Sequence, residues 1–201
     1  MRESLNTYSA DISAGSLLLK ESRPIALLLL AQADDQAWYQ ALVVDNVLQK
    51  KSPASAKRMA RLIRKRLELM GPGVWRLVAE GGNDVATQAL MAAAVKDSRL
   101  LADFMTKVVS DHLKTYKTQL TSNDWKRFLV DCEHRDPSVA KWSESTRKKV
   151  GQVVIRILAE AGYLDNTRSM NLTPLHLVPE VRRYLIENNE GAVLRCLEVG
   201  Q

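Results

Sequence analysis

The stretch TRKKVGQVVIRILAEAGYLDN, residues 146–166, carries the clearest periodic pattern in the chain. Its apolar residues recur at intervals of three and four, the spacing that places side chains on one face of an α-helix. They form one apolar arc: Val150, Val153, Val154, Ile157, Leu158 and Ala161. Gly162 follows as a C-terminal cap, because glycine readily adopts the left-handed conformation that ends many helices. The stretch therefore predicts a helix over residues 144–161, with Ser143 as its N-cap.

The segments on either side of this helix extend the pattern to a small domain. Downstream, short apolar segments at residues 163–164 and 170–177 flank the polar turn DNTRS, which is typical of two strands in a hairpin. Residues 179–187 return to a helical pattern. Upstream, a helix beginning DWKRFLVDCEH is followed by the short segment SVAKW. The order helix, short helix, long helix, hairpin, helix predicts a winged helix-turn-helix domain over residues 121–201.

The preceding part of the chain contains only helical patterns, with little β-branched alternation. The expected helices span residues 12–21, 24–33, 35–49, 53–70, 73–80, 84–95 and 98–116. Gly71-Pro72-Gly73 ends one of them, because proline cannot continue the hydrogen-bond ladder. The polar stretch QLTSN at residues 119–123 marks a boundary. We therefore expect a mainly α fold, in which an all-helical bundle domain over residues 1–120 precedes the winged domain.

The side of the 144–161 helix opposite its apolar arc is polar and basic, and we call it the polar face. It consists of hydroxyl, amide and cationic side chains: Ser145, Lys148, Lys149, Gln152 and Arg156. Such groups bind phosphate oxygens and the base edges in the major groove. Lys141 lies in the turn before the helix, and Arg168 lies at the tip of the expected hairpin. We interpret these residues as a DNA-contacting surface; the alternative is a wing used only for packing or dimer contacts.

A second basic surface is encoded by SAKRMARLIRKR, residues 55–66, which contains six cations and no acid. Five of the cations fall within roughly 120° of a helical wheel, and we call them the basic stripe: Lys57, Arg58, Arg61, Arg64 and Lys65. Arg66 falls in the apolar arc, so it must extend its head to solvent or meet an acidic partner. The stripe is either a solvated helix face or a surface for nucleic acid, protein or membrane, and its low acid content favours an anionic partner.

The chain as a whole is basic. Its 201 residues include 29 Lys or Arg and 23 Asp or Glu, which gives a net charge of +6. This balance favours nucleic acid, an anionic membrane surface or an acidic partner. The apolar run PIALLLLA at residues 24–31 is shorter than the roughly 20 residues that a spanning helix needs, and the N-terminus lacks a secretory signal pattern. We therefore expect a cytoplasmic protein with no membrane contact.

The sequence lacks the common motifs of catalysis and metal binding. It contains no GxSxG elbow and no GxxxxGK[ST] nucleotide loop. Cys132 and His134 supply at most two metal ligands, and no second pair accompanies them. Cys196 is far from Cys132 in the sequence, so no disulfide framework is indicated. We expect no enzymatic activity, no metal and no cofactor.

Three stretches give the chain a resemblance to a known family. They are SAGSLLLKESRPIALLLL at residues 13–30, RLIRKRLELMGPGVWRLVAEGG at residues 61–82, and the stretch at residues 146–166. Over nearly its full length the chain resembles the BrxA family, small proteins of the BREX bacteriophage-exclusion systems. The resemblance implies a helical core similar to the RNA-binding antitermination protein NusB, an attached winged helix, and double-stranded DNA binding as an accessory of a defence complex. It fixes no individual contact residue.

These observations lead to one hypothesis and one rival. The hypothesis is a non-enzymatic, double-stranded DNA-binding accessory protein of a bacterial BREX phage-defence system, with other subunits of that system as partners. Both basic surfaces would hold phosphates, and any base reading would belong to the polar face. The rival is a protein-interaction adaptor, or an RNA-binding module, whose basic helix docks an acidic partner subunit.

Overall fold

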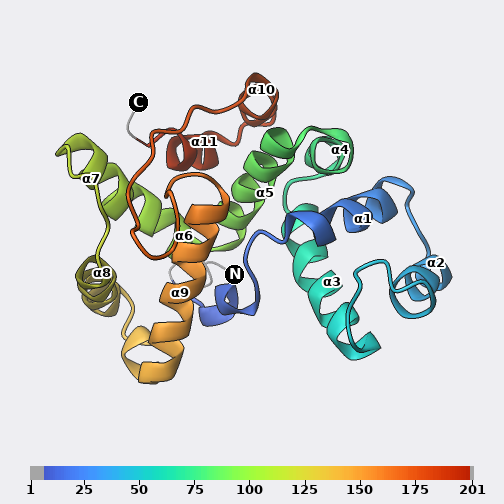
Figure 1. Ribbon diagram of the computed structural model, residues 1–201, viewed down its shortest axis with the longest axis horizontal. Helices are drawn as coiled ribbons and strands as arrows, with labels where there is room; N and C mark the ends of the chain where they lie inside the picture. The colour runs from blue at the N-terminus through green and yellow to red at the C-terminus, as the bar shows by residue number, and fades with distance from the viewer. Residues whose placement is uncertain (1–6, 200–201) are drawn as a thin grey trace. The chain divides into compact units, whose positions relative to one another are not determined.

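The computed structural model of the protein describes residues 7–199. Regular structure within that range is helical and contains no β-strand (Figure 1). The prediction of a mainly α fold is therefore confirmed.

The two predicted strands at residues 163–164 and 170–177 are wrong. In the described part of the chain two isolated antiparallel bridges take their place, Leu164 with Leu172 and Gln119 with Asn171. The reason lies in Asp165, whose carboxylate accepts a hydrogen bond from the backbone N–H of Asn171 (2.9 Å). Side-chain hydrogen bonds to the backbone compete with a strand ladder, so the segment closes as a loop.

The described chain forms two compact units. Unit 1 contains the described residues up to Ser16, then Ser98–His176, and those from Gly191 onward; unit 2 contains Leu17–Asp97 and Leu177–Glu190. These units cut across the predicted boundary at residue 120. A division into compact units does not test which parts of the chain fold independently. The domain boundary at residue 120 therefore stays a prediction.

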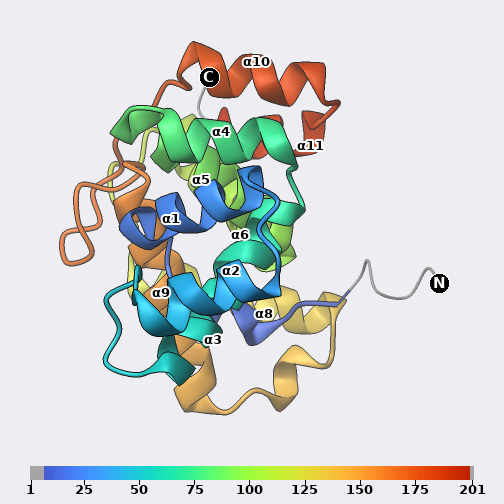
Figure 2. The ribbon, with the colours of Figure 1, turned by 90° about the vertical axis from the view of Figure 1, so that its right-hand side faces the viewer.

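Unit 2 is built around one buried helix. Its elements are α1 (Leu19–Leu30), α2 (Asp35–Tyr39), η3 (Gln40–Val44), α3 (Pro53–Glu68), α4 (Pro72–Glu80), α5 (Asn83–Asp97) and α10 (Pro179–Glu187). Helix α5 contacts α1, α3, α4 and α10 (Figure 2). Alanines make up much of its buried surface: Ala86, Ala89, Ala92, Ala93 and Ala94. Because alanine side chains are small, helices can approach α5 closely from several sides.

Helix α1 differs from the two helices predicted at residues 12–21 and 24–33. It is one helix with Pro24 inside it. Proline removes a backbone hydrogen bond within a helix, but Ile25 and Ala26 are fully buried, where α1 packs against α3 and α4. We attribute the continuity of α1 to this burial, which offsets the loss of one hydrogen bond.

Helix α3 contains the basic stripe and confirms the expectation for Arg66. The Arg66 side chain is 5% exposed, and its Nε lies 3.5 Å from Oδ2 of Asp97 at the end of α5. Asp97 is similarly buried and also pairs with Lys65 at 2.7 Å. The acidic partner of Arg66 is therefore a residue of the central helix of the unit. Ser52 accepts a hydrogen bond from the Ser55 N–H (3.3 Å) and caps the start of α3.

Helix α10 confirms the prediction for residues 179–187, but it belongs to unit 2. Its Leu185 is fully buried, and the Tyr184 hydroxyl donates a hydrogen bond to the Met70 carbonyl. The Tyr184 ring occupies the space beside Gly73 that a side chain would fill. At the start of the segment, the Val178 N–H donates to the Gln88 side chain (2.7 Å). These contacts dock α10 onto α4 and α5.

Unit 1 surrounds an aromatic cluster. Its elements are η2 (Ala10–Ala14), α6 (Arg99–Phe104), η4 (Met105–Val109), α7 (Ser110–Lys114), α8 (Ser122–Arg135), η5 (Val139–Lys141), α9 (Glu144–Glu160) and α11 (Gly191–Leu197). Phe104 meets Trp125 and Phe128 edge to face, with ring centroids 5.5 and 5.1 Å apart. Helix α11 was not predicted; its Leu197 carbonyl accepts a hydrogen bond from the buried Tyr163 hydroxyl (2.8 Å).

Helix α9 confirms the prediction for residues 144–161. Ser143 accepts a hydrogen bond from the Thr146 N–H (3.2 Å) and is the N-cap. Gly162 follows the helix with φ of 86°, the left-handed conformation expected of a C-terminal cap. The predicted apolar arc is buried in full: Val150, Val153, Val154, Ile157, Leu158 and Ala161.

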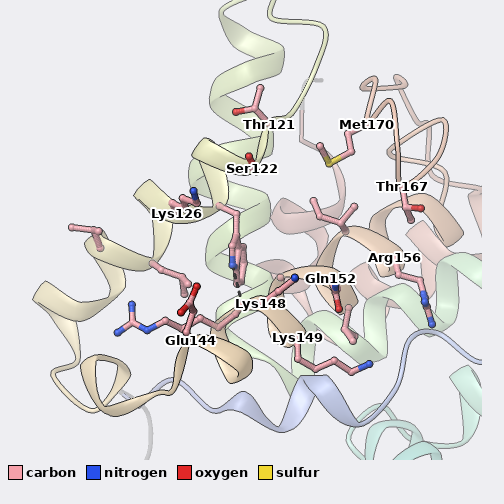
Figure 3. A pocket seen from close by; sticks show the side chains of 17 residues that line it. Thr121, Ser122, Lys126, Glu144, Lys148, Lys149, Gln152, Arg156, Thr167 and Met170 are labelled. Atoms are coloured by element: carbon pink, nitrogen blue, oxygen red, sulfur yellow. Dashed lines mark hydrogen bonds between the residues drawn. The ribbon is translucent and has the colours of Figure 1, made fainter.

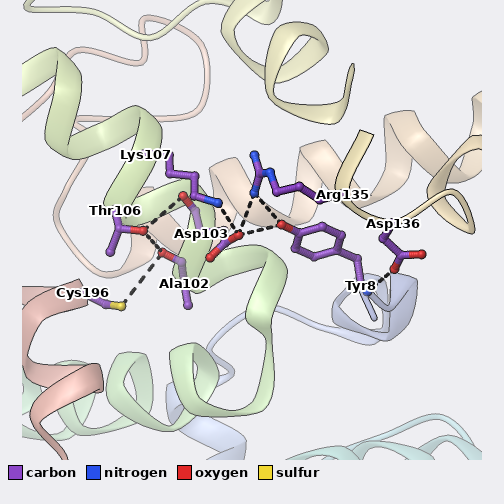
Figure 4. A network of polar contacts seen from close by, with 8 residues as sticks. All are labelled: Tyr8, Ala102, Asp103, Thr106, Lys107, Arg135, Asp136 and Cys196. Carbon is purple, nitrogen blue, oxygen red and sulfur yellow. Dashed lines mark hydrogen bonds and ion pairs between the residues drawn. The ribbon is translucent and has the colours of Figure 1, made fainter. Parts of the chain in front are cut away.

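A polar network holds the N-terminal segment, residues 7–16, to the rest of unit 1 (Figure 4). The Tyr8 hydroxyl donates to Asp103 Oδ2 in α6 (2.6 Å). Arg135, at the end of α8, donates to the Tyr8 hydroxyl (2.6 Å) and pairs with Asp103 (2.9 Å). Lys107 also pairs with Asp103 (2.8 Å), and the Tyr8 backbone N–H donates to Asp136 (2.7 Å). One carboxylate thus joins the N-terminal segment, α6, η4 and α8.

The apolar run at residues 24–31 lies within and just after α1. Across residues 7–199, no helix has the length and apolar character needed to cross a membrane.

We expect Asp97→Asn to lower the free energy of unfolding by about 3 kcal/mol, because it removes the charge that pairs with the buried Arg66. Urea denaturation followed by circular dichroism measures the change. The matched control is Glu68→Gln, which breaks the exposed pair with Arg64 and should cost less than about 0.5 kcal/mol. Equal small losses in both variants would contradict the structural role of Asp97.

Asp103 gives a second, pH-dependent prediction. Burial opposes its ionisation, but the hydrogen bonds from Lys107 and Tyr8 outweigh burial and lower its pKa. A lowered folded pKa stabilises the fold above the ordinary carboxyl pKa of about 4, and this contribution is lost as the pH falls through the folded value.

Asp103→Asn should therefore cost about 2 kcal/mol near neutral pH, and its difference from the unmodified protein should shrink below about pH 4. Denaturant titrations across this pH range test the expectation, with exposed Asp111→Asn as the control. A difference that stays constant with pH would show that the Asp103 charge does not stabilise the fold.

Candidate nucleic-acid interface

A groove of about 840 Å³ lies between α8 and α9 in unit 1 (Figure 3). Its lining includes the buried apolar side chains Trp125, Leu129 and Val153. The polar lining residues are mostly hydroxyl, amide and cationic: Thr121, Ser122, Lys126, Arg147, Lys148, Lys149, Gln152, Arg156 and Thr167. Among the described residues that line the groove, Glu144 is the one acid. The groove therefore combines an apolar base with a positive border.

The spacing of α8 and α9 is set by Gly151 and Trp125. A Cβ atom at Gly151 would lie 2.5–2.9 Å from three atoms of the Trp125 indole. The indole N–H donates to the Arg147 carbonyl one turn earlier in α9 (3.2 Å). The indole thus packs directly on the α9 backbone, and any side chain at position 151 would displace it.

Four cations of the groove are exposed and available to a ligand: Lys126, Lys148, Lys149 and Arg156. Within residues 7–199, no carboxylate or ring lies in pairing distance of any of these four side chains. Clustered like charges repel one another, and a bound anion relieves that repulsion. This border is the strongest candidate in unit 1 for phosphate contact.

Arg147 has a different role from its lysine neighbours. Its guanidinium donates to the carbonyls of Trp142 (3.1 Å), Val139 (3.2 Å) and Ala140 (3.3 Å), and it pairs with Glu133 in α8. These contacts fix the turn that joins α8 to α9. Arg147 positions α9 and leaves the phosphate-binding role to other cations.

The structure places the predicted polar face on one exposed side of α9, and three of its cations and Gln152 line the groove. Ser145 is exposed, but its hydroxyl shares a hydrogen bond with Ser143 (2.9 Å) at the N-cap. Lys141 in η5 and Arg168 in the following loop are exposed and lie outside the groove lining. Their predicted DNA contacts stay predictions.

The loop after α9 is held by a single carboxylate. Asp165 accepts hydrogen bonds from the Ser169 hydroxyl (2.7 Å) and from the Asn171 side chain (2.8 Å). The hydroxyl of Ser169, followed by the neighbouring N–H groups, lowers the Asp165 pKa. Thr167 and Met170 of this loop line the groove. The loop therefore has a defined shape at the edge of the candidate interface.

Sequence reasoning missed the contribution of α8. Ser122, Lys126 and Val130 line the groove from this helix. Their spacing of four residues places them on one helix face, so a helical wheel of DWKRFLVDCEH could have shown Lys126 on the side away from Phe128. Thr167 and Met170 carried no such signal, because a loop has no periodicity.

In unit 2, all five cations of the basic stripe are exposed on α3: Lys57, Arg58, Arg61, Arg64 and Lys65. They are not equally available. Arg64 pairs with Glu68 (2.7 Å) and Lys65 pairs with Asp97 (2.7 Å). Arg58 and Arg61 have no ion pair with any residue between 7 and 199. The centre of the stripe is thus the part open to an anion.

The geometry around Cys132 shows an inert thiol. The residue is fully buried in α8, and burial raises the pKa of its thiol to about 11. A raised pKa keeps a thiol protonated and unreactive. Across residues 7–199, no group of three or more His, Cys, Asp or Glu side chains is placed to hold a metal ion.

Gly151→Ala should lower the free energy of unfolding by about 1–3 kcal/mol, because the new methyl group overlaps the Trp125 indole. Helix propensity alone predicts the opposite change, because alanine stabilises a helix relative to glycine by about 1 kcal/mol. The control is Gly191→Ala in α11, where a Cβ meets an ordinary contact at 3.6 Å. A Gly151→Ala variant as stable as the control would mean that α8 and α9 tolerate a wider spacing.

Comparison with known proteins identifies relatives over nearly the whole chain. The family model described as BrxA matches residues 6–189. A protein named BREX protein BrxA from Paramagnetospirillum magneticum (strain ATCC 700264 / AMB-1) is 45% identical over 192 residues, 96% of each chain. Another BREX protein BrxA, from Escherichia coli O9:H4 (strain HS), is 37% identical over 95% of this chain and 90% of its own.

A solved structure shares the fold. The crystal structure of an uncharacterized protein from Magnetospirillum magneticum matches with a TM-score of 0.87 and 43% identity, over 96% of this chain and 98% of that chain. The family match and the two relatives each cover more than nine-tenths of this chain. The resemblance found in the sequence is confirmed, and the chain belongs to the BrxA family.

Proposed function

We propose that this protein is a non-enzymatic, double-stranded DNA-binding accessory of a bacterial BREX phage-defence system. The observation that carries the proposal is the groove border of Lys126, Lys148, Lys149 and Arg156, four exposed cations with no carboxylate in pairing distance among residues 7–199. Lys and Arg that meet phosphates release condensed counterions from DNA, which supplies most of the non-specific affinity.

The shape of α9 suits the major groove. An α-helix with its side chains is about 10–12 Å across, and the major groove of B-DNA is about 12 Å wide. On the exposed side of α9, Gln152 lies between lysines and an arginine. An amide side chain can read adenine, while the cations hold the phosphates on either side. The proposal assigns base contacts to Gln152 and phosphate contacts to its neighbours.

The proposal includes a winged helix-turn-helix arrangement in unit 1. Helix α8, the turn at η5, helix α9 and the loop over residues 162–174 follow in the order of that motif. The single bridge between Leu164 and Leu172 stands where a wing would have its strands. In this arrangement Arg168 lies at the wing tip and Lys141 lies before the recognition helix, so both are placed to contact the backbone of the duplex.

The basic stripe of unit 2 provides the second proposed phosphate contact, within a helical bundle that we take to be similar to NusB. Arg58 and Arg61 at its centre are the residues available for this role. The stripe has fewer free cations than the groove border. We therefore assign the larger share of the affinity to α8 and α9.

The biological setting of the proposal comes from the relatives. Both curated relatives are named BREX protein BrxA, so we propose that other subunits of such a system are partners of this chain and that it acts in the cytoplasm.

Charge reversal tests the groove. The unmodified protein should bind a duplex with log K falling against log salt with a slope of about −5 if roughly six phosphates are neutralised. Lys148→Glu with Lys149→Glu should reduce the slope to about −3, since each lost phosphate contact removes about one unit. Fluorescence anisotropy with a labelled duplex at several salt concentrations measures both slopes.

The control carries the same charge change elsewhere in unit 1. Lys114→Glu with Lys117→Glu alters two exposed lysines outside the groove lining, and it should leave the slope close to that of the unmodified protein. Absence of duplex binding at low salt would overturn the proposal, as would binding that does not respond to salt. Preference for structured RNA in competition would favour the RNA-binding alternative, and a nuclease-resistant pull-down of an acidic subunit would favour the adaptor.

A further inference from the structure

Two aromatic side chains of α2 lie against the basic stripe of unit 2. The Arg64 guanidinium lies over the Trp38 ring, 4.9 Å from its centroid. The Lys57 ammonium lies over the Tyr39 ring at 5.5 Å. Lys57 and Arg64 are seven residues apart in α3, about two turns. The two rings therefore lie under cations near the two ends of the stripe.

The two rings differ in exposure. Trp38 is half-buried, and Arg64 covers one of its faces. Tyr39 is 54% exposed, and exposed apolar surface continues after it at Val44 and Val47. Apolar surface of this kind remains in contact with water unless a ligand covers it. Tyr39 is thus the ring that a planar ligand group can reach.

Two further cations of the stripe are available to a ligand. Arg58 and Arg61 lie between Lys57 and Arg64 in the sequence and are exposed. Neither has an ion pair with another residue between 7 and 199. An open aromatic ring beside free guanidinium groups is the combination that holds single-stranded nucleic acid, by base stacking and phosphate contact.

We propose that this surface, formed by Trp38, Tyr39, Lys57, Arg58, Arg61 and Arg64, binds single-stranded DNA. A base stacks on Tyr39, and the flanking phosphates meet Arg58 and Arg61. The inference rests on the proposed function in one respect, the affinity of the stripe for DNA phosphates. It adds the unpaired form of the DNA as the preferred ligand of unit 2, because bases within a duplex are already stacked on each other.

Binding exchanges one contact for another at Tyr39. A cation–π contact at an exposed site is weak, so a base can replace Lys57 on the ring. The released ammonium group then becomes free to meet a phosphate. A ribose 2′-hydroxyl is the group by which proteins distinguish RNA from DNA. The inference takes its choice of DNA from the proposed function, and the oligo(U) probe described below tests that choice.

The test uses the full chain and four labelled probes of equal length: oligo(dT), an abasic strand, a duplex and oligo(U). Fluorescence anisotropy gives the Kd for each. Tyr39→Ala should weaken oligo(dT) binding about ten-fold, since stacking on an aromatic side chain is a main source of single-strand affinity. Tyr39→Phe keeps the ring and should bind as the unmodified protein does. The unmodified protein should bind the abasic strand more weakly than oligo(dT).

Two controls separate this inference from the proposed duplex binding. Tyr116→Ala removes a 91% exposed tyrosine of unit 1 and should leave oligo(dT) binding unchanged. Lys148→Glu with Lys149→Glu should weaken duplex binding more than oligo(dT) binding, and Tyr39→Ala should do the reverse. Equal affinity for abasic strand and oligo(dT), an unaffected Tyr39→Ala variant, or a preference for oligo(U) would each overturn the inference, whatever the duplex result.

Discussion

The candidate interface depends on one close approach, that of the Trp125 indole to the α9 backbone at Gly151. The indole is held from both sides: its N–H bonds to the Arg147 carbonyl, and its ring packs against Phe104 and Phe128. Arg147 in turn fixes the turn between α8 and α9 through three carbonyls and Glu133. The spacing and the crossing of the two helices follow from these contacts. A glycine in the middle of a helix lowers the stability of that helix. At position 151 it allows the Trp125 indole to pack on α9, so the residues that border the groove are held on rigid helices.

The two basic surfaces differ in how the fold neutralises their charge. On α3, Lys65 pairs with Asp97 and Arg64 pairs with Glu68, while the rings of Tyr39 and Trp38 lie under Lys57 and Arg64. Three of the five stripe cations therefore have partners within the protein, and the buried pair of Arg66 with Asp97 beside the stripe links α3 to α5. Around α9 the described structure provides no such partners for Lys148 and Lys149. Similar runs of Lys and Arg in the sequence thus differ in availability: within residues 7–199, Arg58 and Arg61 of the stripe have no ion pair, whereas all four cations of the groove border have none.

Much of the helical architecture could be predicted, because periodicity and capping are local properties. The bounds of α9, the cap at Gly162 and the position of Arg66 on the apolar side of its helix all follow from residues close in sequence. The failures have another cause, since they depend on contacts that periodicity does not describe. Pro24 continues a helix because tertiary packing offsets a lost hydrogen bond. Residues 170–177 form no strand because the Asp165 carboxylate takes the backbone N–H of Asn171, six residues later, which a strand ladder would use. Likewise Lys126 joins the candidate site only when α8 and α9 pack together.

The most distant of these contacts concerns α10. Its own sequence predicts a helix, but nothing local indicates that the helix completes unit 2, where Tyr184 reaches the Met70 carbonyl and Leu185 is fully buried. Unit 2 is therefore encoded by two segments with most of unit 1 between them. Because the chain is made from its N-terminus, α8 and α9 are synthesised before the helix that completes unit 2. Helix α5 has exposed apolar surface until α10 arrives, and unit 2 reaches its full stability only after the whole candidate interface of unit 1 has been made.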